Sequence, residues 1–186
     1  MKKGFIAARS RKGGINLGLA NRLGVTIWWQ GKGGLTISKV QKHIQTMMQY
    51  EDPPTFIMLH VEANDIGNVK LGLIQFQLKS LISWIAKQMP YAKIIFSQLL
   101  LRLSWRYSEN NSKMEKCRRR INSVIASFIV KNGGYYMYYP DIKADNQFLV
   151  PDGVHLDELG NNILHNIIQG AIETFIYDES KYSFPY

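Results

Sequence analysis

The stretch Thr55-Phe56-Ile57-Met58-Leu59-His60-Val61 follows Glu51-Asp52-Pro53-Pro54 and precedes Glu62-Ala63-Asn64-Asp65. It is almost entirely apolar, too short for a helix of its own, and bounded by prolines on its N-terminal side. Such a run predicts a strand that is buried on both faces, as in a parallel sheet. The polar residues after it would then lie at the carboxyl end of the strand, where open α/β sheets bind ligands.

Strand and helix patterns alternate on both sides of this run. Strands are predicted at residues 25–29, 55–61, 92–101 and 135–139, and helices at residues 37–50, 69–89, 112–131 and 158–176. The connections are long enough for right-handed parallel crossovers, so the sequence predicts one α/β domain with helices on both faces of a parallel sheet. Residues 177–186 are polar and aromatic, and we expect them to form a frayed tail.

Composition and charge limit the classes of protein that need to be considered. The 186 residues are 46% hydrophobic and 20% charged, which is typical of a globular protein, and the net charge of +9 is concentrated in residues 2–12 and 113–120. Basic clusters are more often solvated faces, but they also suit weak electrostatic contact with nucleic acid. The single Cys117 cannot form an internal disulfide, and no apolar run reaches membrane-spanning length. We therefore expect an intracellular, cytoplasmic protein without a membrane span.

A carboxylate and a histidine lie three residues apart in Asp152-Gly153-Val154-His155. This spacing on a turn allows the carboxylate to bond one imidazole nitrogen and leaves the other nitrogen available as a base. The alternative is a helix entry in which Asp152 or Asp157 caps the next helix and His155 has no chemical role. These residues alone favour neither interpretation.

Two further groups follow predicted strands. Gly31, Gly33 and Gly34 come after residues 25–29, and Asn64-Asp65 come after residues 55–61. A glycine N–H and an asparagine amide are donors suited to an oxyanion. Each group alone also suits an ordinary turn or cap.

Together these motifs resemble the SGNH (GDSL-type) hydrolases, in particular a divergent branch associated with mobile elements. That family has an Asp-x-x-His block near its C-terminus, matched here by Asp152 and His155, and a Gly-x-Asn-Asp block, matched by residues 62–65 with Glu62 in place of glycine. The resemblance implies a three-layer, flavodoxin-like fold and hydrolysis of acetyl or acyl esters without a cofactor. It also implies that His155 is the base, Asp152 orients it, and Gly34 and Asn64 complete the oxyanion hole.

The nucleophile is the main departure from the family pattern. The sequence contains no Gly-x-Ser block, and Ser10 is the only serine before residue 25. We therefore expect an N-terminally truncated domain that lacks the first strand, with Ser10 as a weak candidate nucleophile and with impaired or absent catalysis. Glu62 would add an unfavourable charge beside the oxyanion donor. The alternative function is a basic nucleic-acid-associated module without catalysis. No metal site is expected, because the four histidines, at positions 43, 60, 155 and 165, are not at paired ligand spacing.

Overall fold

A computed structural model describes residues 9–10, 13–61 and 63–185 of the chain. The chain forms two compact units. The larger unit comprises residues 34–100 and 105–138, and the smaller unit comprises residues 1–33, 101–104 and 139–186. The prediction of a single domain stays a prediction.

The larger unit is built on three parallel strands, β1 (Phe56–Leu59), β2 (Lys93–Ser97) and β3 (Tyr135–Met137). β2 lies between the other two, with Phe56 opposite Lys93 and Ile95 opposite Tyr135. The apolar side chains of β2 from Ile94 to Phe96 are buried. The predicted parallel α/β architecture is therefore confirmed, and its central strand is the most deeply buried one.

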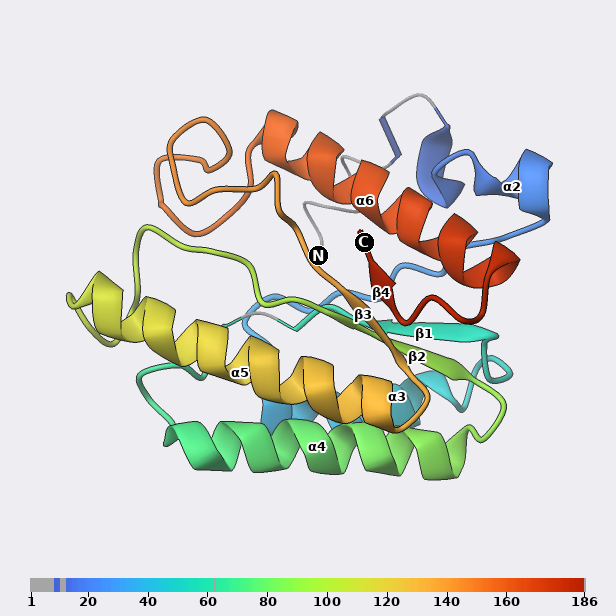
Figure 1. Ribbon diagram of the computed structural model, residues 1–186, viewed down its shortest axis with the longest axis horizontal. Coiled ribbons are helices and arrows are strands. Elements are labelled where there is room, and N and C mark those ends of the chain that lie inside the picture. Colours follow the sequence, from blue (N-terminus) through green and yellow to red (C-terminus); the bar gives the residue numbers. More distant parts are fainter. Residues whose placement is uncertain (1–8, 11–12, 62, 186) are drawn as a thin grey trace. The chain divides into compact units, whose positions relative to one another are not determined.

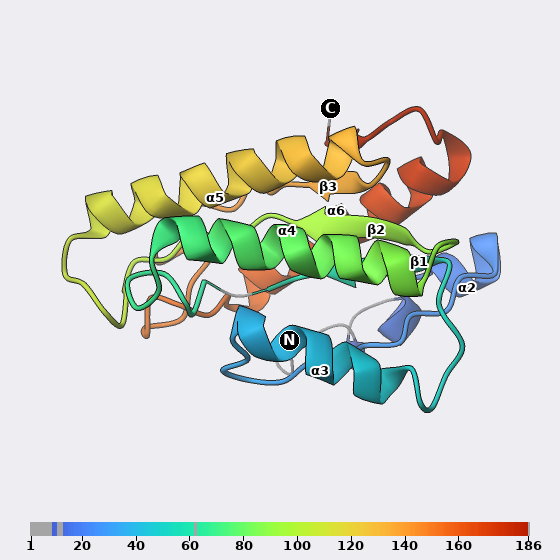
Figure 2. The ribbon, with the colours of Figure 1, turned by 90° about the horizontal axis from the view of Figure 1, so that it is seen from below.

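Three helices pack on this sheet: α3 (Ile37–Met47), α4 (Leu71–Gln88) and α5 (Asn111–Lys131). Figure 2 shows them side by side over one face of the strands. Their apolar stripes recur every three or four residues, for example Ile121, Ile125 and Ile129 on α5, all of which are buried. They form one core with Leu59 and Phe96 of the sheet.

The smaller unit contains a 3-10 turn η1 (Gly14–Asn16), the short helix α2 (Leu19–Leu23), the long helix α6 (Glu158–Tyr177) and the two-residue strand β4 (Ser183–Phe184). An ion pair between Arg22 and Glu173 connects α2 to α6. Figure 1 shows β4 returning beside α6, and the Phe184 ring lies against the Cα of Gly170. Residues 177–186 thus include a short strand, while fraying of this tail in solution stays a prediction.

The strand predicted at residues 25–29 is wrong. This segment keeps an alternating pattern of exposure, from half-buried Val25 to exposed Trp28, but it joins no strand. Its hydrogen bonds go elsewhere: the N–H of Ile27 donates to Asn16 Oδ1 at 2.8 Å, and Trp29 Nε1 donates to the carbonyl of Ile15 at 2.7 Å. β-Branched and aromatic composition suits a strand but does not supply a neighbouring strand to pair with.

Few N-terminal residues can be compared with the prediction. Residues 9–10 are helical and Ser10 is exposed, while Glu62 and most of the basic arm at residues 2–12 lie outside the described residues. No strand occurs in the described part of residues 9–33. Across the described residues, none of the helices has both the length and the apolar character needed to cross a membrane.

Candidate active site

Asp152 and His155 form the hydrogen-bonded pair predicted from their spacing. Asp152 Oδ2 lies 2.6 Å from His155 Nδ1, and Asp152 Oδ1 accepts the backbone N–H groups of Val154 and His155 at 2.8 and 2.9 Å. Both side chains are 44% exposed. Asp152 therefore uses both of its oxygens to fix one turn and one imidazole ring, and the ring stays open to solvent.

Residues 103 and 104 hold the turn in place through hydrogen bonds to Gly153. Its carbonyl accepts N–H groups from Leu103 and Ser104 at 2.8 and 3.2 Å, and its backbone has a left-handed φ of 67°. A Cβ at this position would lie 3.1 Å from Leu103 Cβ and 3.3 Å from Ser104 Cβ. Glycine is needed here for two reasons, because it permits both the backbone conformation and the close approach of Leu103 and Ser104.

A pair of backbone contacts closes the base of the same turn. Leu149 and Leu156 form an antiparallel bridge, and the N–H of Val150 donates to the carbonyl of His155 at 2.9 Å. Both leucines are buried. The exposed Asp–His pair thus projects from a small closed loop with apolar anchors.

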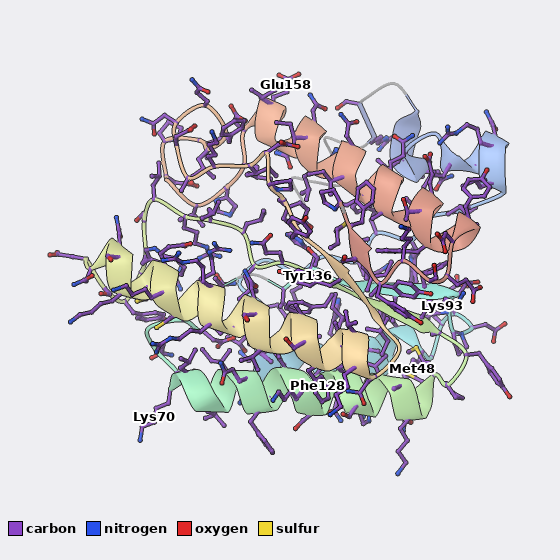
Figure 3. All side chains as sticks on the ribbon, viewed as in Figure 1. Met48, Lys70, Lys93, Phe128, Tyr136 and Glu158 are labelled. Carbon is purple, nitrogen blue, oxygen red and sulfur yellow. The ribbon has the colours of Figure 1, made fainter. Side chains whose placement is uncertain are left out.

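The helix-entry interpretation is correct for Asp157 but not for Asp152. Asp157 is the N-cap of α6, and its side chain accepts the N–H of Gly160 at 2.7 Å. Glu158, labelled in Figure 3, adds a second acidic group in the first turn, where the helix dipole favours it. Because Asp157 serves the helix, Asp152 is available to orient His155.

Electrostatics keep Asp152 ionised. The backbone N–H of His155 is the largest cause that lowers the pKa of the Asp152 carboxyl well below its usual range, and the imidazole and the N–H of Val154 act in the same direction. A carboxylate that stays ionised accepts a hydrogen bond from the Nδ1–H group of an imidazole. This leaves Nε2 with its lone pair, which is the arrangement that a general base requires.

The predicted oxyanion donors, Gly34 and Asn64, both belong to the larger unit. Gly34 has a φ of 67°, and a Cβ there would meet nothing within 4 Å, so glycine is needed for its backbone conformation alone. Asn64 is half-buried in a turn after β1, between buried Ala63 and buried Asp65. The oxyanion roles of both residues stay predictions.

The sequence did not reveal a second histidine contact in the larger unit. His60 Nδ1 lies 2.6 Å from Ser97 Oγ, which joins the residue after β1 to the last residue of β2. Ser97 is fully buried, so its hydroxyl is a structural partner of the imidazole and is not placed to attack a substrate. The one feature of the sequence that could have indicated this contact is a serine, Ser97, at the end of a largely apolar strand.

A buried polar cluster on α5 was also missed. Asn122 Oδ1 accepts the N–H of Leu99 at 2.9 Å, and both Asn122 and Arg118 donate to the Leu99 carbonyl. Arg118 also forms two 2.7 Å hydrogen bonds to Glu115. Burial raises the pKa of nearby Tyr136 on β3, labelled in Figure 3, to about 12 despite the opposing charge of Arg118. Arg118 therefore does not belong to the solvated basic face, which on α5 consists of exposed Lys113, Lys116, Arg119 and Arg120.

Comparisons with known proteins bear on the fold. No family model and no curated protein matches the sequence. Among solved structures, a family 3 carbohydrate esterase from Clostridium thermocellum is similar over 92% of this chain and 93% of its own, with 18% identity and a TM-score of 0.65. The chain has the fold of the SGNH hydrolases. A GDSL-like lipase from Bacteroides thetaiotaomicron is also similar, over 78% of this chain and 74% of its own, with 18% identity and a TM-score of 0.58.

The SGNH fold confirms the architecture that the sequence motifs implied. At 18% identity the likeness is one of fold, and it assigns no residue a role. Within this fold, Asp152 and His155 lie within hydrogen-bond distance of each other.

Proposed function

We propose that this chain is an SGNH-type ester hydrolase domain in which His155 is the general base for hydrolysis of small acetyl or acyl esters. The observation that carries the proposal is the 2.6 Å hydrogen bond between His155 Nδ1 and Asp152 Oδ2 on an exposed turn. The similarity in fold to a carbohydrate esterase and a GDSL-like lipase supports the reaction class. Gly34 and Asn64 are proposed as the oxyanion donors.

The proposed reaction uses water as the nucleophile. His155 Nε2 takes a proton from water as the oxygen bonds to the ester carbonyl carbon, and the carbonyl oxygen becomes the oxyanion. The donors that the family resemblance implies for an oxyanion are the Gly34 N–H and the Asn64 amide. The tetrahedral intermediate then breaks its bond to the alcohol oxygen, which takes the proton back from Nε2. The ionised Asp152 stabilises the imidazolium between these two proton transfers.

Catalysis by this chain is proposed to be slow. Because the sequence has no Gly-x-Ser block, no acyl-enzyme step is assigned to a serine. In hydrolases that lose their catalytic triad, binding and the oxyanion hole retain roughly 10³–10⁴-fold acceleration over water, while about 10⁶-fold is lost. The chain is therefore expected to hydrolyse activated esters measurably and unactivated esters poorly.

Turnover of matched chromogenic substrates tests the reaction class. We expect 4-nitrophenyl acetate to be hydrolysed faster by the folded chain than by a heat-denatured sample, and 4-nitrophenyl phosphate to be left unchanged. Equal rates for folded and denatured protein on the acetate would contradict the proposal.

Fluorophosphonate labelling tests the nucleophile separately. We expect no stoichiometric modification of any serine, exposed Ser10 and buried Ser97 included. Labelling of one serine that disappears in His155→Ala would instead show a serine mechanism and would replace the water mechanism.

A second candidate function is non-catalytic contact with nucleic acid, and the exposed basic residues of α5 favour it. Lys113, Lys116 and Arg120 follow each other at helical spacing and are all exposed. Binding through such side chains weakens steeply with salt. Fluorescence anisotropy with single-stranded DNA at 50 and 200 mM salt tests this. We expect weaker binding at the higher salt concentration, and no binding by the triple variant in which Lys113, Lys116 and Arg120 are replaced by glutamate. Equal binding by wild type and the triple variant would exclude this surface.

A further inference from the structure

Asp65 is a buried carboxylate that reaches across the larger unit. It is 6% exposed, and its Oδ2 accepts the backbone N–H of Ile37 at 2.9 Å, a contact between residues 28 positions apart. Among the described residues, no Lys, Arg or His lies within ion-pair distance of it. Burying a carboxylate is costly unless it is hydrogen-bonded, and here a backbone N–H rather than a cation is the partner. This suggests that the role of Asp65 is to hold that backbone N–H.

The contact supplies the N-terminal cap of α3. The residue in the cap position, Thr36, makes no side-chain hydrogen bond to a backbone N–H of the helix, and its hydroxyl lies instead 3.2 Å from the side-chain Oγ of Ser38. Asp65 thus satisfies one of the free N–H groups at the start of α3 from a distant segment, where the helix dipole also favours a negative charge.

The two ends of this contact lie close in sequence to the two proposed oxyanion donors. Ile37 lies three residues after Gly34, and Asp65 follows Asn64 directly. The turn at Asp65 is closed by its own carbonyl, which accepts the N–H groups of Asn68 and Val69 at 3.2 and 2.9 Å. The turn after β1 is therefore fixed locally, and the Asp65 side chain connects it to the first residue of α3, directly after the loop that contains Gly34.

We propose that Asp65 is a positioning residue that holds the Gly34 loop and the Asn64 turn in a fixed relation, so that both donors serve one oxyanion. The oxyanion role rests on the proposed function, whereas the connection between the two segments does not. Oxyanion stabilisation depends on donors being placed in advance, so a loosened loop would reduce it even if the fold were intact.

Amide hydrogen exchange measured by NMR tests the connection. In Asp65→Ala we expect the Ile37 amide to exchange about ten- to a hundredfold faster, as for loss of a charge-assisted hydrogen bond, and Gly34 to exchange faster with it. Asp65→Asn keeps an oxygen acceptor and should restore much of the protection. Asp52→Ala, which removes an exposed aspartate in the same unit, is the matched control and should change neither amide. Unchanged exchange at Ile37 in Asp65→Ala would overturn the proposal.

Titration with sodium acetate, a carboxylate anion and the product of acetyl ester hydrolysis, tests the positioning. In the wild type we expect the NMR signals of the Gly34 backbone amide and the Asn64 side-chain amide to shift as acetate is added, and both shifts to fit one dissociation constant. That constant should rise at least about tenfold in Asp65→Ala and stay near the wild-type value in Asp65→Asn. Wild-type titration behaviour in folded Asp65→Ala, or no acetate shift in the wild type, would overturn the positioning role. Normal acetate binding in a wild type without ester turnover would overturn the proposed function alone.

Discussion

Asp152 Oδ2 lies 2.6 Å from His155 Nδ1 within a turn of four residues, and Asp152 Oδ1 accepts two backbone N–H groups of that turn. One side chain thus sets both the shape of the loop and the orientation of the imidazole. Substitutions of Asp152 should therefore affect catalysis and stability together, and the two effects can be separated by pH.

Asp152→Asn is expected to lower ester turnover by at least about 100-fold at neutral pH. An amide can donate to Nδ1 and so favour the wrong tautomer, which removes the lone pair from the position of the base. The measurement is the initial rate on 4-nitrophenyl acetate. Asp141→Ala, which removes an exposed aspartate of the same unit, is the control and should keep the wild-type rate. Equal loss in both variants would contradict a specific role for Asp152.

The same substitution has a predicted pH signature in stability. Hydrogen bonds, the largest from the His155 N–H, lower the pKa of the Asp152 carboxyl in the folded chain. The ionised group therefore stabilises the fold fully above its unfolded value of about 3.9, and this stabilisation is lost as pH falls through the lowered value. The gap in urea midpoint between wild type and Asp152→Asn should be present at pH 5 and shrink below about pH 4. A gap that widens below pH 4 would contradict the assignment.

Gly153→Ala is expected to destabilise the chain by about 1–3 kcal/mol and to disturb the Asp–His turn. Its φ is 67°, and the added Cβ would press against Leu103 and Ser104. Gly24→Ala is the matched control, because Gly24 has a φ of 65° in the same unit with nothing within 4 Å of an added Cβ. Gly153→Ala should lose more unfolding free energy than Gly24→Ala, and the difference measures the cost of the contact between the added Cβ and its two neighbours. Equal losses would show that backbone conformation alone requires glycine.

Arg118→Ala is expected to cost about 2–4 kcal/mol of unfolding free energy. The substitution leaves the Leu99 carbonyl with fewer donors and Glu115 without its bidentate partner. Neighbouring Arg119 is exposed and lies 3.7 Å from Glu115, so Arg119→Ala should change stability by less than about 0.5 kcal/mol. Urea unfolding of both variants provides the measurement, and similar effects at the two positions would contradict the buried role of Arg118.

Local patterns in the sequence were enough for much of the fold and for half of the candidate site. Apolar periodicity predicted the helix that begins at Ile37, and a three-residue spacing predicted the contact of Asp152 with His155. Both depend on residues that are close in sequence. The strand predicted at residues 25–29 was wrong because pairing requires a partner strand, and local composition does not provide that information.

Contacts between distant residues account for what the sequence did not reveal. The bond from the Ile37 N–H to Asp65 spans 28 residues, and the contact between His60 and Ser97 spans 37. Each brings together the ends of separate elements, so the tertiary fold has to be known before either can be stated. Arg118 shows the converse, because it lies within a basic run in the sequence yet is buried against Leu99 in the structure.

The most direct test of the central claim is the rate of 4-nitrophenyl acetate hydrolysis by purified wild type, His155→Ala and the control Asp141→Ala. If His155 is the general base, the alanine variant should lose at least about 100-fold in turnover while remaining folded, and Asp141→Ala should match the wild type. Wild-type turnover in folded His155→Ala would show that the Asp152–His155 pair does not carry the reaction.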